Sequence, residues 1–118
     1  MYTQKVLDHF EHPRNSGELR DASAVVQVSN PVCGDTLELA VKVQDCVITE
    51  VRFRAKGCVA AVACASVLTE LAQGSDVQKA NEIEVGTIIS KLDSLPRESM
   101  HAASLAVDAL KQALRTIS

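Results

Sequence analysis

Aromatic residues and basic charge are both scarce in this sequence. Of 118 residues only Tyr2, Phe10 and Phe53 are aromatic, tryptophan is absent, and 12 basic against 15 acidic residues give a net charge of −3. A nucleic-acid-binding domain needs a basic surface for the phosphates, or aromatic rings on which single-stranded bases stack. This composition offers neither, so we expect no nucleic-acid partner.

The sequence also lacks a long apolar run. No stretch approaches the roughly 20 apolar residues that a membrane-spanning helix requires, and the first residues contain no apolar core of a signal peptide. We therefore expect a cytoplasmic protein without membrane contact. In a reducing compartment, cysteines serve as metal ligands, reactive thiols or small buried residues rather than as disulfides. The four cysteines are Cys33, Cys46, Cys58 and Cys64.

The remaining composition is that of an ordinary globular protein. Apolar residues make up 47% of the chain and charged residues 23%, which excludes disorder, collagen-like repeats and coiled coils. With 118 residues the chain is about the size of one domain, and we expect residues 1–118 to form a single domain. Because aromatic rings are so few, its core must consist of valine, leucine, isoleucine and alanine.

Hydrophobic periodicity predicts the order of helices and strands. Spacings of three and four residues indicate helices, strict alternation indicates half-buried strands, and Gly or Pro marks the boundaries. The expected elements are a helix at 3–11, strands at 24–29, 36–43 and 47–56, a helix between Cys58 and Gly74, one or two short helices broken near Gly86 within 76–93, and a helix at 100–117. This order predicts an α+β fold, in which an N-terminal helix precedes a three-stranded antiparallel sheet and several helices cover one face of it.

The same patterns assign faces to these elements. In the strands at 36–43 and 47–56, the odd-numbered residues form the apolar face and the even-numbered ones are mostly charged. In the first helix, Val6, Leu7 and Phe10 recur at helical spacing. The last helix has an apolar stripe that consists of Met100, Ala103, Val107, Leu110, Leu114 and Ile117.

Three element boundaries carry residues with useful chemistry. Cys33 and Asp35 lie two positions apart in a loop between strands, and His101 lies at the start of the last helix. Cys58 lies at the start of another helix, where the unpaired amides and the dipole are expected to lower the pKa of its thiol. Singly, each residue has a structural explanation as a buried, turn or surface residue. Together they would supply two thiolates, an imidazole and a carboxylate, a set that suits tetrahedral zinc or iron.

The other two cysteines are not expected to join this set. Cys64 follows Cys58 by six residues, which on a helix means about 240° of rotation and ~9 Å of rise. The two side chains would not meet at one metal, and we interpret Cys64 as a small core residue. Cys46 lies in the hairpin loop at the far end of its strand from Cys58, and it is the thiol expected to oxidise first if exposed.

Several segments resemble the U-type iron–sulfur cluster assembly scaffold family (IscU/NifU-like). They cover essentially the whole chain in the family's order. The matching segments are Tyr2 with residues 5–17, Asn30-Pro31-Val32-Cys33-Gly34-Asp35, Gly57-Cys58, Ala63-Cys64-Ala65-Ser66, Leu95-Pro96 and His101 with the helix beyond it. The resemblance implies that residues 1–118 correspond to the NifU-like N-terminal scaffold domain, with the α+β fold given above.

The resemblance also implies a function and its partners. It implies a scaffold or carrier, not an enzyme, that binds iron or a [2Fe–2S] cluster through Cys33, Cys58 and His101, with Asp35 as the fourth, exchangeable ligand. Imidazoles replace two thiolates in Rieske-type clusters, so a mixed set is chemically reasonable. Zinc is a further expected occupant of the purified protein. Sulfur would come from a cysteine desulfurase, the cluster would pass to acceptor apo-proteins, and the chain would be a monomer or weak homodimer.

Two departures from the family pattern leave alternatives open. Where the family has His-Cys, this sequence has His101-Ala102, and an alanine can neither accept persulfide sulfur nor ligate metal. The family's Leu-Pro-Pro-Val-Lys chaperone-recognition segment is replaced by Leu-Pro-Arg-Glu-Ser at 95–99. The alternative function is therefore a zinc-binding regulatory module that docks on a desulfurase without building clusters. A third hypothesis is an enzyme with Cys33 or Cys58 as nucleophile and His101 as base.

Overall fold

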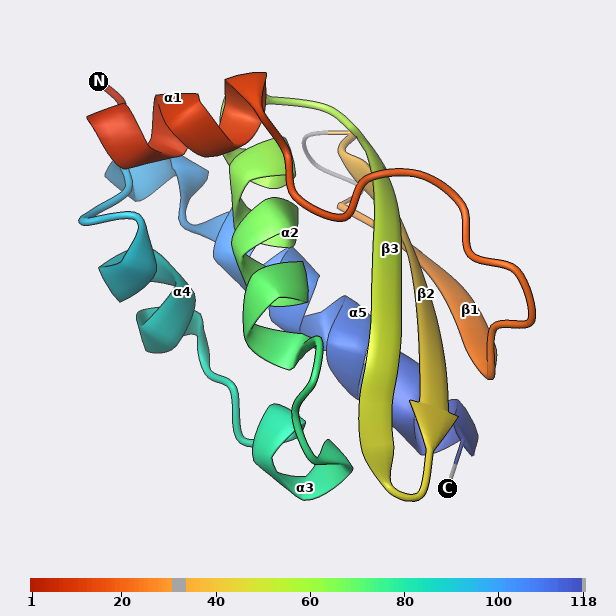
Figure 1. Cartoon of the computed structure of the whole chain (residues 1–118). Helices are drawn as coiled ribbons and strands as arrows, with labels where there is room; N and C mark the ends of the chain where they lie inside the picture. The colour runs from red at the N-terminus through yellow and green to blue at the C-terminus, as the bar shows by residue number, and fades with distance from the viewer. Residues whose placement is uncertain (31–33, 118) are drawn as a thin grey trace.

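The computed structural model describes residues 1–30 and 34–117. In chain order its elements are α1 (Gln4–Glu11), β1 (Ala24–Ser29), β2 (Thr36–Gln44), β3 (Val47–Lys56), α2 (Val59–Ala72), α3 (Val77–Ala80), α4 (Val85–Lys91), the 3₁₀ helix η1 (Arg97–Ser99) and α5 (His101–Ile117). The strands form an antiparallel sheet in the order β1-β2-β3 (Figure 1). The predicted α+β fold, a helix followed by three strands and then helices, is confirmed.

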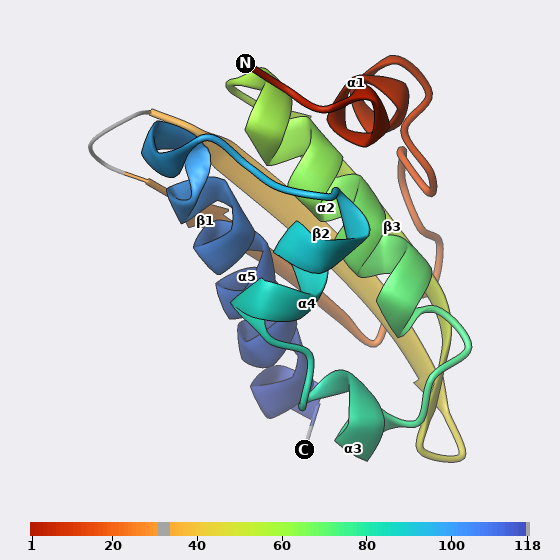
Figure 2. The ribbon, with the colours of Figure 1, turned by 90° about the vertical axis from the view of Figure 1, so that its left-hand side faces the viewer.

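The helices cover one face of this sheet. α2 and α5 pack against the strands, and α4 lies over α2 and α5 on the side away from the sheet (Figures 1 and 2). Between these layers lies an aliphatic core, as the composition predicted. Its largest fully buried side chains include Leu39, Val41, Ile48, Leu68, Ile88 and Leu110. Each buried aliphatic side chain of this size contributes roughly 1.5–3 kcal/mol, so packing against α2 and α5 stabilises even the short helix α4.

Near the hairpin, a β-bulge reverses which side chains of β3 face the helices. Lys42 pairs with Glu50, whereas the next residue, Val43, pairs with Ile48, so Thr49 has no partner in the ladder. As a result Ile48 is fully buried and Thr49 is exposed. The assignment of Thr49 to the buried face is therefore wrong at this end, because the extra residue of a bulge shifts the alternation. From residue 51 onward the odd-numbered side chains of β3 face the helices as predicted.

α1 buries a histidine on its inner face. The helix begins after its N-cap residue, Thr3, whose hydroxyl accepts the N–H of Val6 at 3.2 Å. Val6 is fully buried, but Phe10, which shares its helical spacing, is 40% exposed. His9 lies on the inner face instead. There its Nδ1 is 2.8 Å from the buried hydroxyl of Ser66 on α2, and this hydrogen bond satisfies the buried ring. A polar partner on another element thus decides which face of α1 is buried.

The helix predicted between Cys58 and Gly74 is α2. It ends at Ala72, and Gly74 follows with φ +84°, a left-handed conformation that glycine adopts without steric cost. Cys64 is fully buried within α2. Burial raises the pKa of its thiol to about 12, so Cys64 is an uncharged core residue, as interpreted from the sequence.

Two predictions for the later helices are wrong in detail. The chain is not broken at Gly86, which lies inside α4; the interruption is at residues 81–84, between α3 and α4. A glycine in the first turn of a helix costs little when the helix packs on a core. Met100, expected on the apolar stripe, precedes α5 and is 41% exposed. The stripe itself is confirmed and is wider than predicted, because four alanines of α5 are also buried: Ala102, Ala106, Ala109 and Ala113.

Candidate metal centre

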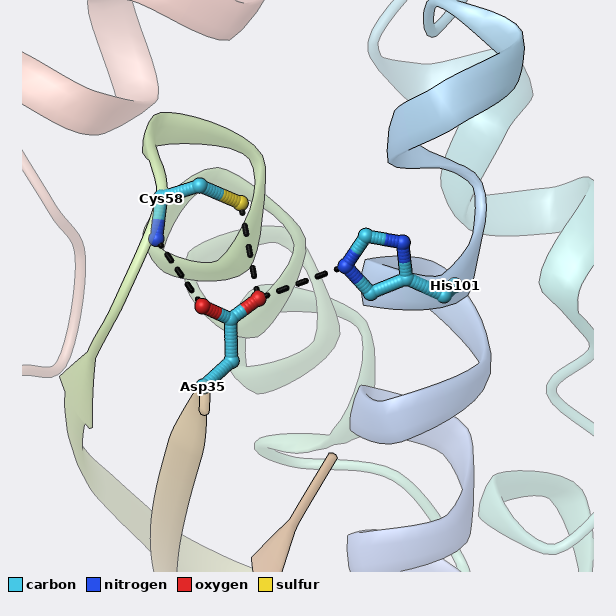
Figure 3. Close-up of side chains that lie close together, drawn as sticks. All are labelled: Asp35, Cys58 and His101. Carbon is cyan, nitrogen blue, oxygen red and sulfur yellow. Dashed lines mark hydrogen bonds and ion pairs between the residues drawn. The ribbon is translucent and has the colours of Figure 1, made fainter. Parts of the chain in front are cut away.

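Three element ends meet at one end of the sheet. Asp35 directly precedes β2, Cys58 is the N-cap residue of α2, and His101 is the first residue of α5 (Figure 3). One ligand atom from each residue lies within 4.8 Å of the other two. In the sequence, Asp35 is 23 positions from Cys58 and 66 from His101. Only the fold brings these three side chains together.

Strand pairing explains why Asp35 and Cys58 are neighbours. Thr36 at the start of β2 pairs with Lys56 at the end of β3, so the residues just beyond these two positions leave the sheet side by side. Gly57 then adopts φ +146°, which directs the chain from β3 into α2. The main-chain oxygen of Asp35 accepts the N–H of Asn30 at 2.8 Å, which fixes the carboxylate-bearing residue at the strand end.

The carboxylate of Asp35 organises the cluster. Its Oδ1 accepts the main-chain N–H of Cys58 at 3.2 Å, and its Oδ2 lies 3.5 Å from the Cys58 Sγ and 3.3 Å from Nε2 of His101 (Figure 3). Asp35 is only 3% exposed. A buried carboxylate is costly unless it is hydrogen-bonded or paired, and these contacts meet that requirement. Oδ1 therefore fixes the backbone of Cys58, and Oδ2 holds the Cys58 and His101 side chains in place.

The environment of Cys58 opposes ionisation of its thiol. Burial raises the pKa of Cys58, the amide of Ala61 at the start of α2 lowers it, and the nearby Asp35 carboxylate raises it again. The prediction of a lowered pKa is therefore wrong in direction, since the helix amides act as expected but burial and Asp35 outweigh them. The metal-free protein holds Cys58 as a thiol at neutral pH, and a metal ion would displace that proton.

The cluster opens into a cavity of about 330 Å³ that is accessible from solvent. Its lining comprises Asp35, Gly57, Cys58, Glu98, Ser99 and His101. Sulfur, imidazole nitrogen and carboxylate oxygen are together the donor set that zinc and iron accept. The donors present therefore fit a transition-metal ion, and the cavity leaves room for further ligands.

The four ligands predicted from the sequence can now be placed. The structure brings together Asp35, Cys58 and His101, whereas Cys33 lies outside the described residues. Their assignment as ligands remains a prediction. Cys46 is exposed in the hairpin at the opposite end of β3 from Cys58, and it is not part of the cluster.

Among the residues of this cavity that sequence reasoning missed, Gly57 and Glu98 bear most on the site. Gly57 shapes the turn into α2, and its position directly before a helix-capping cysteine was the available signal. Glu98 precedes His101 by three residues, and Glu-x-x-His is a known metal-ligand spacing on helices. In the sequence alone, neither residue stands out beyond its place in a motif.

An α+β domain with such a cluster at one end of its sheet belongs to the class of candidate metal-binding domains. Comparison with known proteins defines the class further. The model of the family "NifU-like N terminal domain" matches residues 1–117. The chain belongs to this family.

Named relatives of the chain are scaffold proteins. The iron-sulfur cluster assembly scaffold protein IscU 1 of Archaeoglobus fulgidus is 43% identical over 114 residues, which span 97% of this chain and 74% of the relative. The iron-sulfur cluster assembly scaffold protein IscU of Aquifex aeolicus is 40% identical over 116 residues, with 97% and 74% covered. The resemblance to the U-type scaffold family is thereby confirmed.

Solved structures support the fold. The N-terminal part of a nitrogen-fixing NifU-like protein from Brucella abortus superposes with a TM-score of 0.79 at 19% identity, over 98% of this chain and 92% of that one. A structure from Fervidobacterium islandicum gives 0.82 at 23% identity, with 96% of each chain covered. At these identities the likeness concerns the fold alone. In the described part of the chain, no helix has the length and apolar character needed to cross a bilayer.

Proposed function

We propose that this chain is a scaffold on which an iron–sulfur cluster is assembled and then passed to acceptor apo-proteins. One observation carries the proposal: the donor atoms of Asp35, Cys58 and His101 lie within 4.8 Å of one another at the mouth of an open cavity. Membership of the family and the scaffold names of its relatives support it. In this proposal residues 1–118 act as one scaffold domain.

The cargo is iron or a [2Fe–2S] cluster. Cys58 and His101, together with Cys33, are its proposed ligands, and Asp35 is the fourth. Iron–sulfur clusters are held preferentially by thiolates, with imidazole as an accepted substitute. A carboxylate oxygen is a harder and more readily exchanged donor. A site with one such donor can release its cargo, which a permanent four-thiolate site resists.

Before loading, Asp35 holds the site in order. Its two oxygens position the Cys58 amide, the Cys58 thiol and the His101 ring at 3.2, 3.5 and 3.3 Å. Loading removes the thiol proton and requires a neutral imidazole. Acidification should therefore weaken binding, because protons compete for both donors.

The partners follow from this role. Sulfur would be supplied by a cysteine desulfurase, and the finished cluster would pass to an apo-protein, so the chain itself is a carrier rather than an enzyme. We propose a monomer or weak homodimer in the cytoplasm, where thiols stay reduced. No contact of the described residues and no compared protein favours the zinc-binding regulatory module.

Anaerobic reconstitution with iron and sulfide tests the proposal. The wild type should develop the visible absorption of a cluster and transfer it to an apo-ferredoxin. Cys58→Ser should lose both properties. Cys46→Ser is the matched control, because it removes an exposed thiol from the other end of β3, and it should behave like the wild type. Tight retention of zinc without cluster absorption in the wild type would contradict the proposal.

A further inference from the structure

A second carboxylate, that of Glu98, lines the cavity of the metal centre. Glu98 lies in η1, and it borders the same cavity as Asp35, Cys58 and His101. Asp35 is buried, whereas Glu98 is exposed at the rim. The cavity therefore contains one carboxylate already engaged with Cys58 and His101 and another that faces solvent.

The backbone places Glu98 three residues before His101, so that both lie on the same surface of this helical segment. η1 and α5 are joined without a break, since Ser99, Met100 and Ala103 donate main-chain hydrogen bonds to Pro96, Arg97 and Met100 at 2.9, 3.3 and 3.1 Å. In a 3₁₀ turn, residues i and i+3 eclipse one another, and on a helix their Cβ atoms are about 5–6 Å apart. Glu98 and His101 have this spacing. It is the Glu-x-x-His arrangement that supplies paired ligands in carboxylate-bridged metal proteins.

The Glu98 side chain is free to turn toward a metal ion. Within residues 1–30 and 34–117, its carboxylate forms no hydrogen bond or ion pair, so no existing contact has to be broken. Its backbone is fixed by the buried neighbours Leu95 and Ser99. An anchored main chain with an unengaged carboxylate at the cavity rim fits a ligand that joins when the metal arrives.

We propose that Glu98 is an additional oxygen ligand of the metal centre, closing over the ion held by Asp35, Cys58 and His101. The inference rests on the proposed function, since it concerns the same site. It assigns a donor to a chain in which residue 102 is an alanine that cannot ligate. A second carboxylate oxygen beside that of Asp35 would also favour oxygen-accepting iron over purely thiophilic metals.

Metal binding by the metal-free protein tests this proposal. Zinc affinity is measured by competition with a chromophoric chelator, and the ligand field is read from the visible spectrum of bound Co²⁺. Glu98→Gln keeps the shape of the side chain and removes its charge. It should weaken zinc binding roughly tenfold, as loss of a group that supports a metal site does, and it should change the Co²⁺ spectrum.

Glu84→Gln is the matched control. Glu84 is an exposed carboxylate at the start of α4 and makes no capping hydrogen bond, so its loss changes the net charge equally. It should leave affinity and spectrum unchanged. Unaltered zinc affinity and Co²⁺ spectrum in Glu98→Gln would overturn the inference, as would an equal loss in both variants, which would indicate long-range charge only.

Two further results can be told apart from a failure of the inference about Glu98. A wild type that binds neither Zn²⁺ nor Co²⁺ would contradict the proposed function before any mutation is compared. If thermal melting shows that Glu98→Gln does not fold, Glu98→Ala is measured with the same two readouts, and the same criteria apply to it.

Discussion

Gly57 and Asp35 lie so close that no side chain fits between them. A Cβ atom at Gly57 would lie 2.1 Å from Oδ1 of Asp35, and the φ of Gly57 is +146°. Glycine is therefore needed for two reasons: the conformation is one that L residues rarely adopt, and the space is filled by the carboxylate that contacts Cys58.

Replacing this glycine should damage the metal centre. Gly57→Ala should displace the Asp35 carboxylate, and it should lower the stability of the fold by about 1–3 kcal/mol, the cost of a strained backbone residue. Metal affinity should fall as well, because Asp35 would no longer hold Cys58 and His101. Calorimetric melting and zinc competition measure the two effects.

Gly86→Ala is the control for that experiment. A Cβ at Gly86 meets nothing within 4 Å, and the residue lies inside α4. Alanine there should be neutral or stabilising by up to about 1 kcal/mol. An Asp35→Ala background removes the two closest conflicts, those with Oδ1 and Cγ, and leaves only the Cβ of residue 35 at 3.0 Å. Gly57→Ala should then cause little further loss of metal affinity. If the losses of metal affinity caused by Gly57→Ala and Asp35→Ala add up fully in the double variant, Gly57 does not act through Asp35.

Restoring a thiol beside His101 should strengthen cluster retention. The described site has one thiol, that of Cys58, whereas [2Fe–2S] centres are usually held by four thiolates. Ala102→Cys adds a sulfur in the first turn of α5, next to His101. We expect a severalfold slower decay of cluster absorbance in the presence of a chelator.

The matched variant for this comparison is Ala106→Cys. Ala106 lies one turn further along α5 and, like Ala102, is only 1% exposed, so it controls for a new buried thiol as such. It should leave the decay rate unchanged. If Ala102→Cys also decays at the wild-type rate, residue 102 does not reach the cluster.

His9 should make the fold sensitive to mild acid. Burial lowers the pKa of His9, as does the nearby charge of Arg14, while Glu70 and Asp8 oppose the shift. The unfolded chain then binds a proton more readily than the folded chain, so stability is complete above the unfolded pKa of about 6.5 and is lost as pH falls below it.

Urea unfolding at several pH values between 5 and 8 measures this effect. The midpoint of the wild type should fall on acidification, and His9→Gln should fall less steeply although it is less stable throughout. His12→Gln serves as control, because His12 is an exposed neighbour of α1. An identical pH dependence in the wild type and His9→Gln would show that another group is responsible.

The sequence predicted the elements well because their signals are local. Alternation in β2 and β3 and the three–four spacing of α5 each depend on neighbouring residues, and the ends of these elements were found nearly to the residue. Two errors arose where a contact with a residue distant in the sequence determines which side chain is buried. The bulge at Thr49 depends on strand pairing, and the burial of His9 depends on Ser66 from α2.

The convergence of Asp35, Cys58 and His101 was predictable from the sequence, whereas the pKa of the Cys58 thiol was not. Asp35, Cys58 and His101 were selected because each lies at an element boundary, and the fold brings those boundaries together. The pKa of Cys58 could not be predicted in the same way. It depends on how deeply the thiol is buried and on an aspartate 23 residues earlier in the chain, and neither is visible in the local sequence.

The metal content of protein purified without oxygen tests the central claim most directly. The claim is that Cys58, with Asp35 and His101, forms a metal centre that carries iron or an iron–sulfur cluster. The wild type and the control Cys46→Ser should contain iron at a near-stoichiometric level, and Cys58→Ser should have lost it. A wild type without near-stoichiometric iron, or a Cys58→Ser protein with the same iron content as the wild type, would contradict the account.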